Sequence, residues 1–208
     1  MPANFYFNRP VHTSLELITP PAIEPVTLDQ AKAQARVEIS DDDDLISSLI
    51  TAARVQCEAY LRQSFITTTW QFNLDAFPFW RTWSVIGPPI VLPKPPVQTV
   101  AWVKYLDNGG NSTTVDPSLY TVDTASRPAR IVRDFIQPWP VIGFVPNAAQ
   151  VQYTSGYGDT ADDVPAPIKQ AILLLVTYLY AQRGDTEGLA QPPMAVTALL
   201  DSCSHGGF

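Results

Sequence analysis

The residues that could carry chemistry in this sequence are few and scattered. His12 and His205 are its two histidines, and neither has a serine or cysteine partner at the spacing of a nucleophile arrangement. Cys57 and Cys203 belong to no metal-ligand or redox pattern, so we interpret them as free thiols in a reduced compartment. No Walker loop, dinucleotide fingerprint or paired-histidine zinc motif occurs. The sequence therefore predicts no catalytic residue, no cofactor and no metal.

Paired carboxylates offer the main enzymatic alternative, because two aspartates placed close together can act as acid and base in a glycosidase. Five aspartates stand at the ends of predicted strands: Asp75, Asp107, Asp116, Asp123 and Asp134. Their commoner role at such positions is to hold a turn through side-chain to backbone hydrogen bonds. A carbohydrate-active or other hydrolytic enzyme, with tryptophans as its sugar platform, therefore stays open as an alternative, as does a monomeric binding module.

Two further segments have both a functional and a structural interpretation. Four consecutive aspartates at 41–44 could bind calcium or magnesium, but the glycine and glutamate of a calcium loop are missing at the required offsets. The same aspartates favour the start of a helix, where they meet free N–H groups and the positive end of the dipole. Residues 155–158 hold two glycines after a strand, which indicates a turn more than a phosphate-binding loop.

The elements that position these residues are helical on both sides of a β-rich stretch. Thr27 and Gln30 form a capping-box pattern that predicts a short helix over 27–37. Apolar residues at helical spacing predict longer helices over 44–62 and over 167–184. The latter is apolar nearly all round, so we expect it to be buried inside a bundle or between subunits. Residues 189–208 contain a short helical stretch and suit a flexible tail that becomes ordered on a partner.

The stretch between the helices has the alternating pattern of β-strands. Residues 67–74, 97–105 and 151–153 alternate, and 107–111 contain the glycines and asparagines typical of a hairpin turn. Prolines bracket the short run 90–92, which indicates an edge strand. The predicted fold class is α+β, with a bundle of three to four helices interrupted by an antiparallel β-sheet or barrel.

The predicted domains follow from this change of pattern. They are an N-terminal arm at 1–24, a discontinuous helical domain at 25–64 and 163–208 with a C-terminal tail, and a β-rich insertion at 65–162.

The composition indicates a folded, acidic chain. Hydrophobic residues make up 46% of the sequence and charged residues 16%, which is the balance of a chain that folds. Acidic residues outnumber basic ones by 20 to 13 and give a formal net charge of -7, which repels the phosphates of DNA. Such a surface suits a channel through which DNA passes without sequence-specific binding. The longest apolar run, 168–181, is too short for a membrane span, so no membrane partner is expected.

Several segments resemble, in order, the phage head-tail connector proteins, and in particular the longer members with an insertion. The similar segments are 24–32, 41–54, 58–60, 68–70, 75–78, 92–97, 151–158 and 164–172. The resemblance runs from about 21 to 183 and carries no catalytic residues. It implies a head completion or adaptor protein of a long-tailed phage or prophage.

The resemblance also implies partners and a location. The expected assembly is a homo-oligomeric ring that docks on the portal protein, matches its twelvefold symmetry, and leads to tail-side stopper or tail terminator proteins. The expected location is the virion neck, after assembly in the host cytoplasm. For such a role we expect the portal to contact apolar residues near the C-terminus: Leu189, Met194, Val196, Leu199, Leu200 and Phe208. We expect neighbouring subunits to contact a second set: Leu173, Leu174, Tyr178, Trp80 and Trp83.

Overall fold

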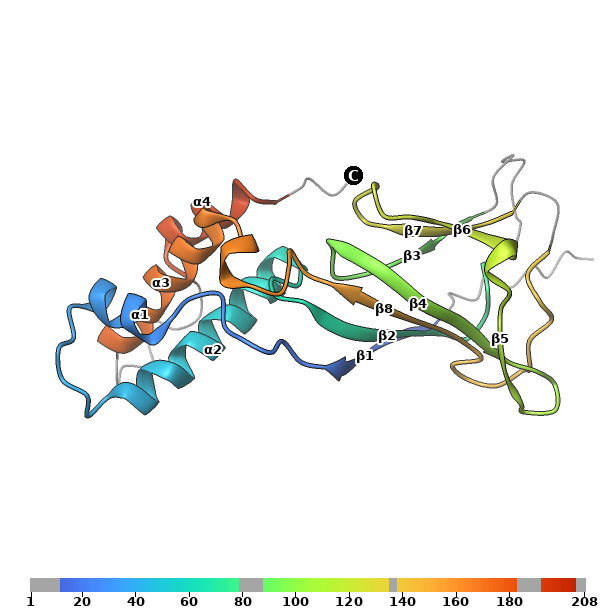
Figure 1. Cartoon of the computed structure of the whole chain (residues 1–208), viewed down its shortest axis with the longest axis horizontal. Helices are drawn as coiled ribbons and strands as arrows, with labels where there is room; N and C mark the ends of the chain where they lie inside the picture. The colour runs from blue at the N-terminus through green and yellow to red at the C-terminus, as the bar shows by residue number, and fades with distance from the viewer. Residues whose placement is uncertain (1–11, 79–87, 135–137, 183–191, 205–208) are drawn as a thin grey trace, which may run out of the picture.

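The computed structural model describes residues 12–78, 88–134, 138–182 and 192–204 of the chain. Its helices lie at one end of an elongated molecule and its β-strands at the other (Figure 1). The described helices are α1 (Leu28–Ala35), α2 (Asp43–Leu61), α3 (Ala166–Ala181) and α4 (Met194–Asp201), with the 3-10 helices η1 (Pro117–Leu119) and η2 (Ala161–Asp163). The strands are β1 (Thr13–Thr19), β2 (Thr68–Leu74), β3 (Ile90–Val91), β4 (Val97–Leu106), β5 (Ser112–Thr114), β6 (Tyr120–Asp123), β7 (Arg130–Arg133) and β8 (Ala149–Ser155).

The first two helices have well-defined ends. At the start of α1, the Gln30 amide donates to Thr27 Oγ1 at 3.2 Å and the Thr27 amide donates to Gln30 Oε1 at 2.9 Å, so the predicted capping box is confirmed. Both helices stop at an arginine in the left-handed conformation, Arg36 after α1 and Arg62 after α2. The sharp end at Arg62 turns the chain from the bundle toward β2.

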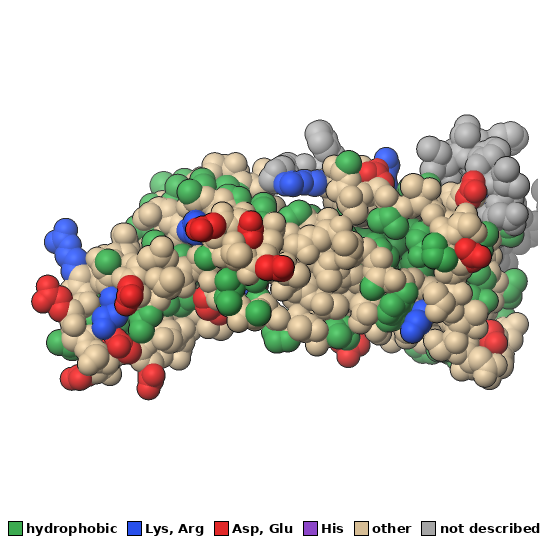
Figure 2. Space-filling view, in the orientation of Figure 1, with side chains coloured by type: hydrophobic (Ala, Val, Ile, Leu, Met, Phe, Trp, Pro, Cys, Tyr) green, Lys and Arg blue, Asp and Glu red, His purple; other side chains and the backbone are tan. Residues whose placement is uncertain are grey.

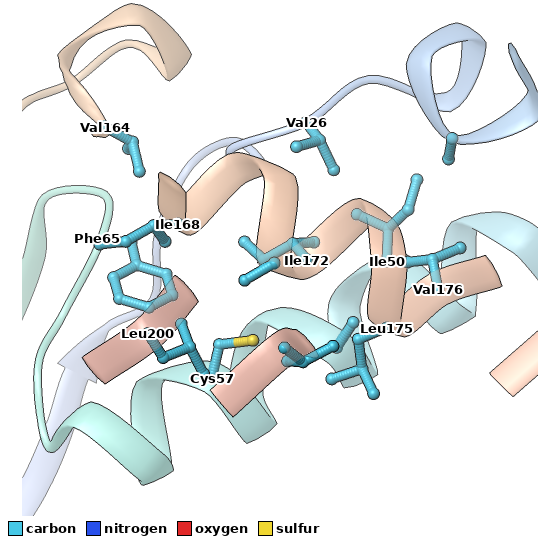
Figure 3. Packing of buried hydrophobic residues seen from close by; sticks show 14 of the residues in the cluster. Val26, Ile50, Cys57, Phe65, Val164, Ile168, Ile172, Leu175, Val176 and Leu200 are labelled. Carbon is cyan, nitrogen blue, oxygen red and sulfur yellow. The ribbon is translucent and has the colours of Figure 1, made fainter. Parts of the chain in front are cut away.

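Helix α3 lies at the centre of the bundle, where α1, α2 and α4 all pack against it. Four of its side chains, Ile168, Ile172, Leu175 and Val176, are at most 1% exposed, and Figure 3 shows them within one hydrophobic cluster. Helix α4 contributes Leu200 to the same cluster, beside residues of α2. The nearly all-apolar α3 is therefore covered largely by its own chain, and residues 194–201 of the predicted flexible tail are an ordered helix on their own subunit.

The strands form two antiparallel sheets with their own hydrophobic core. One sheet has the order β1-β2-β8-β4-β5 and the other has the order β3-β7-β6. Side chains from both sheets, including Phe72, Val103, Ile131, Val151 and Tyr153, meet in one buried cluster between them. Figure 1 shows the smaller sheet lying over the larger one. The predicted α+β class is confirmed, and the described sheets are open and do not close into a barrel.

The edges of the two sheets explain two sequence patterns. Strand β3, from the proline-bracketed run, is an edge strand as predicted, because β7 is its one partner among the described strands. Strand β1 comes from the segment interpreted as an arm, and it pairs with β2 at the edge of the larger sheet, with Leu15 opposite Phe72. The N-terminal segment therefore contributes a strand to the β-rich part of the molecule.

Side-chain hydrogen bonds join the helical bundle to the sheets. The Trp70 indole Nε1 donates to Ser64 Oγ at 3.0 Å, and the buried Ser155 hydroxyl bonds to Ser64 at 3.1 Å. The Tyr157 hydroxyl donates to Gln63 Oε1 at 2.9 Å. Since these bonds link the end of α2 to β2 and to the segment after β8, they fix how the two parts meet.

Candidate interaction surfaces

The aspartates that could have formed an acid/base pair are engaged in turns. Asp107, Asp116 and Asp123 each accept a backbone N–H from a residue two to four positions further along, at 2.8–3.1 Å. Asp75 accepts the Asn147 amide at 3.0 Å, which ties the end of β2 to the loop before β8. The turn interpretation is confirmed for Asp107, Asp116 and Asp123, whereas Asp75 makes a long-range contact to the backbone of another loop. Asp134 is exposed just after β7.

The pKa values of Asp107, Asp116 and Asp123 do not suit a general acid, which needs a raised pKa. Hydrogen bonds from the Asn111 amide lower the pKa of Asp107, and the Ser118 amide lowers that of Asp116. For Asp123, the Ser126 hydroxyl and the Arg130 guanidinium lower the pKa to about 2. These three groups therefore stay ionised at neutral pH, and the arrangement does not favour glycosidase chemistry.

The remaining candidates for chemistry are separated from one another. His12 is exposed immediately before β1, and His205 lies outside the described residues. Cys57 is buried in the helical core, where burial raises the pKa of its thiol to about 12, so it is a poor nucleophile. Within the described residues, no group of three or more histidine, cysteine, aspartate or glutamate side chains could hold a metal ion. Over the same residues, no helix is both long enough and apolar enough to cross a membrane.

The glycine-containing segment 155–158 is a packing turn at the junction. The Gly156 amide donates to the Pro96 carbonyl at 2.9 Å and the Tyr157 amide donates to the Phe65 carbonyl at 2.9 Å, so neither is available to a phosphate. A Cβ atom on Gly156 would lie 2.6 Å from the carbonyl carbon of Ile66. The segment needs glycine because two backbones approach closely there, which confirms the turn interpretation.

The acidic run begins α2, but not by the expected cap. Asp42 stands at the N-cap and its side chain makes no cap hydrogen bond; it accepts the Tyr180 hydroxyl at 2.6 Å instead. Asp43 forms an ion pair with Lys32 of α1 at 2.6 Å. The run therefore favours the helix start through charge in the first turn, while two of its carboxylates fasten the loop to α1 and α3. Figure 2 shows acidic side chains gathered at this end of the molecule.

A groove lies at the other end of α2, between the bundle and the sheets. Its volume is about 760 Å³, and it is lined by the last turn of α2, the loop 91–96, and Arg127 with Pro128. Arg62 and Lys94 bring positive charge to a floor made largely of proline and aliphatic side chains. Sequence reasoning missed this site because its lining residues come from six separate segments of the chain, between Thr13 and Ser204.

The residues predicted to contact the portal do not share one surface. Val196 and Leu200 are each 1% exposed and belong to the helical core, so the prediction is wrong for them: they face inward because α4 packs on α2 and α3. Leu199 is partly buried against the same core, whereas Met194 is 86% exposed. Leu189 and Phe208 lie outside the described residues.

The residues predicted to contact neighbouring subunits are only partly accessible. Leu173, Leu174 and Tyr178 are partly buried and pack against the helical core. Trp80 and Trp83 lie outside the described residues. Their assignment to a subunit interface stays a prediction.

A second apolar surface lies at the β end of the molecule and was not predicted. Phe144 is fully exposed and Val141 is 77% exposed. They border a hollow of about 540 Å³ that Phe77 and Trp139 also line, with their rings stacked at 4.5 Å. The only sequence signal was a run of apolar residues in a proline-containing loop, which also occurs in ordinary turns.

Comparisons with known proteins agree with this architecture. Three similar chains occur in solved structures described as the virion of a native gene transfer agent (GTA) particle, the neck of an empty GTA particle computed with C6 symmetry, and the neck of a native GTA particle computed with C12 symmetry. Their TM-scores are 0.75, 0.73 and 0.68, and their sequence identities are 21%, 21% and 22%. The likeness covers 93–94% of this chain and 96–97% of those chains, so they share its fold.

Sequence comparison gives a narrower result. No curated protein matches the chain significantly. Residues 25–103, which run from the segment before α1 into β4, match the family model described as phage gp6-like head-tail connector protein. Residues 25–103 are therefore similar to the phage gp6-like head-tail connector family, and the resemblance predicted from the sequence is confirmed over this segment.

Proposed function

We propose that this chain is a structural adaptor of a phage-type neck, in which copies form a closed ring between the head and the tail. The observation that carries the proposal is the fold likeness, over 93–94% of this chain, to chains in structures of a GTA virion and of two GTA necks, joined to the connector-family match over residues 25–103. One of those necks was computed with C12 symmetry, which supports a twelvefold ring. The partners proposed for the ring are the portal on one side and the stopper or tail terminator proteins on the other.

The negative charge of the chain supports a role as a channel wall that does not bind DNA. The chain has a formal net charge of -7, so counterion release offers little binding energy to a DNA that passes the ring. No described residue stands in an arrangement for catalysis, and the carboxylates of the β-rich part are held in turns. The negative charge and the aspartates held in turns are therefore better explained by a structural role than by an enzymatic one.

In this proposal the helical domain at 25–64 and 163–208 faces the portal and the β-rich insertion at 65–162 faces the tail. Met194 is the described candidate for portal contact, because it projects from the first turn of α4 and is exposed. Leu189 and Phe208 belong to the same proposed surface. Val196, two positions further along the same helix, points into the core and serves as the matched internal control.

The test mixes the purified chain with the portal protein encoded in the same genome and examines the mixture by electron microscopy. A second ring stacked on the portal is the expected result. Met194→Asp should weaken stacking at least tenfold without moving the thermal unfolding midpoint, whereas Val196→Asp should lower that midpoint because it places a carboxylate in an apolar core. Chains that stay separate from the portal at every concentration would overturn the proposal.

A further inference from the structure

The two ends of α2 carry opposite charge. The acidic loop, defined here as residues 36–44, runs from Arg36 into the first turn of α2 and holds five acidic residues. The C-terminal end of α2 borders the groove with Arg62 and Lys94. A helix of 19 residues spans about 28 Å at 1.5 Å per residue. Because the helix is rigid, a chain cannot place its own acidic loop in its own groove, and only another molecule can bring the two together.

The acidic loop is shaped like a docking element. Glu38, Asp41 and Asp44 are exposed, and among the described residues their carboxylates form no ion pair or hydrogen bond. Ile39 lies between them in sequence and is 59% exposed, so an accessible aliphatic side chain stands among these carboxylates. The bonds of Asp42 and Asp43 to the helices behind them hold the loop in place, so little conformational entropy would be lost on docking.

The groove is complementary in both charge and polarity. Arg62 is exposed beside the end of α2, and Lys94 lies across the groove, 5.8 Å from the centre of the Trp70 ring. Between them the lining is apolar, with Pro95 and Pro96 half-buried and Val91 47% exposed. A positive rim around an apolar floor fits an apolar side chain flanked by carboxylates.

We propose that the loop 36–44 of one copy docks into this groove of the next copy. Ile39 contacts the proline floor, and the carboxylates of Glu38, Asp41 and Asp44 pair with Arg62 and Lys94 of the neighbour. The contact joins two different surfaces of the same chain, the loop of one copy and the groove of the next. Such a heterologous, or head-to-tail, interface between copies can close into a ring. The inference deepens the proposed function and rests on it, since it names the residues that join the copies of the proposed ring.

Charge exchange tests the pairing. The variant Arg62→Glu/Lys94→Glu and the variant Asp41→Lys/Asp44→Lys should each associate at least tenfold more weakly than the original chain, measured by sedimentation velocity. A mixture of the two variants should recover association, because the lysines of one meet the glutamates of the other. The chain with all four substitutions should recover it too. Failure of both combinations to recover association would overturn the inference.

Disulfide cross-linking detects the contact between the acidic loop and the groove directly, even where association is weak. The test variant is Asp41→Cys/Arg62→Cys, with Cys203→Ser to remove the accessible thiol. On oxidation it should form ladders, that is, series of disulfide-linked oligomers. A disulfide between positions 41 and 62 must join two copies, because these positions are about 28 Å apart in one copy. Asp41→Cys/Asp116→Cys, with the second cysteine on the exposed turn before η1, is the matched control.

Taken together, the disulfide test and the portal test distinguish failure of this interface from failure of the proposed function. Rings or portal stacking without ladders above the control would overturn this interface and leave the adaptor role standing. Ladders above the control support the interface, whether or not the portal is present. Chains that neither stack on the portal nor form ladders would overturn both.

Discussion

Among single residues, Arg54 joins the segment before α1 to the end of α2. Its Nε donates to Glu24 at 2.7 Å and its Nη1 donates to Glu58 at 2.9 Å, while the Phe65 amide donates to the other oxygen of Glu58 at 3.0 Å. The Arg54 side chain is 10% exposed and that of Glu58 is 14% exposed. Burial raises the pKa of Glu58 above its ordinary value, although the Phe65 amide and Arg54 oppose the shift. The ionised form of the buried Glu58 carboxylate is therefore stabilised by these two donors.

The variant Arg54→Met tests this dependence. It should lower the free energy of unfolding at neutral pH by about 3 kcal/mol, because a buried carboxylate loses its cation. The deficit should shrink as pH falls through the raised pKa of Glu58, starting above the ordinary glutamate pKa of about 4.3, because the neutral carboxyl costs less to bury and no longer needs the cation. Urea denaturation at several pH values measures both effects. Asp162→Asn is the control, since the ion pair of the exposed Asp162 with Lys169 is 3.8 Å long and should contribute little. Equal deficits in the two variants would contradict the account.

At the scale of elements, local signals predicted what local interactions determine. The capping box of α1, the apolar spacing of α2 and α3 and the hairpin turn before β5 each depend on residues a few positions apart, and each is confirmed. The small sheet was not predicted as such, because β7 pairs with both β3 and β6, and β3 is about forty positions earlier in sequence. The inward face of α4 was also missed, since a short apolar helix has no local signal for the surface that it packs against.

The turn after β8 determines how the bundle meets the sheets, and its glycine can be tested against another. Gly156 and Gly110 both have positive φ, at 137° and 80°, but a Cβ atom would meet the Ile66 backbone only at Gly156. Gly110→Ala should therefore cost about 1 kcal/mol, the penalty for the backbone conformation alone. Gly156→Ala should cost about 3 kcal/mol or more, because Ile66 and Thr67 must also shift. Chemical denaturation of both variants measures the difference.

The comparison between these glycines isolates the contact at the junction. If both variants lose the same free energy, the close approach of the two backbones does not restrict the residue at 156. A larger loss at 156, together with an altered tryptophan fluorescence from the neighbouring Trp70, would place the damage where β2 meets the bundle.

For the whole molecule, the positions of the charged residues determine how copies dock and which surface DNA meets, and the net charge alone does not. The described cations include a group around the groove, Arg62, Lys94 and Arg127, while carboxylates gather at the far end of α2. Head-to-tail docking would cover the positive rim with the acidic loop of the next copy. The assembled ring would then present a more uniformly negative surface than a single chain does, and a negative surface suits a passage for DNA.

DNA binding by the single chain and by the ring should therefore differ in a defined way. At about 0.15 M salt, fluorescence anisotropy of a short labelled duplex should show no binding to either form, because screening leaves interactions only within about 8 Å of each charge. At low salt, single chains should bind weakly through the groove, and Arg62→Glu/Lys94→Glu should abolish that binding. Rings should not bind at either salt concentration, because their grooves are occupied. Tight binding of rings to DNA at 0.15 M salt would contradict a passive channel wall, since a ring that grips DNA would oppose its passage.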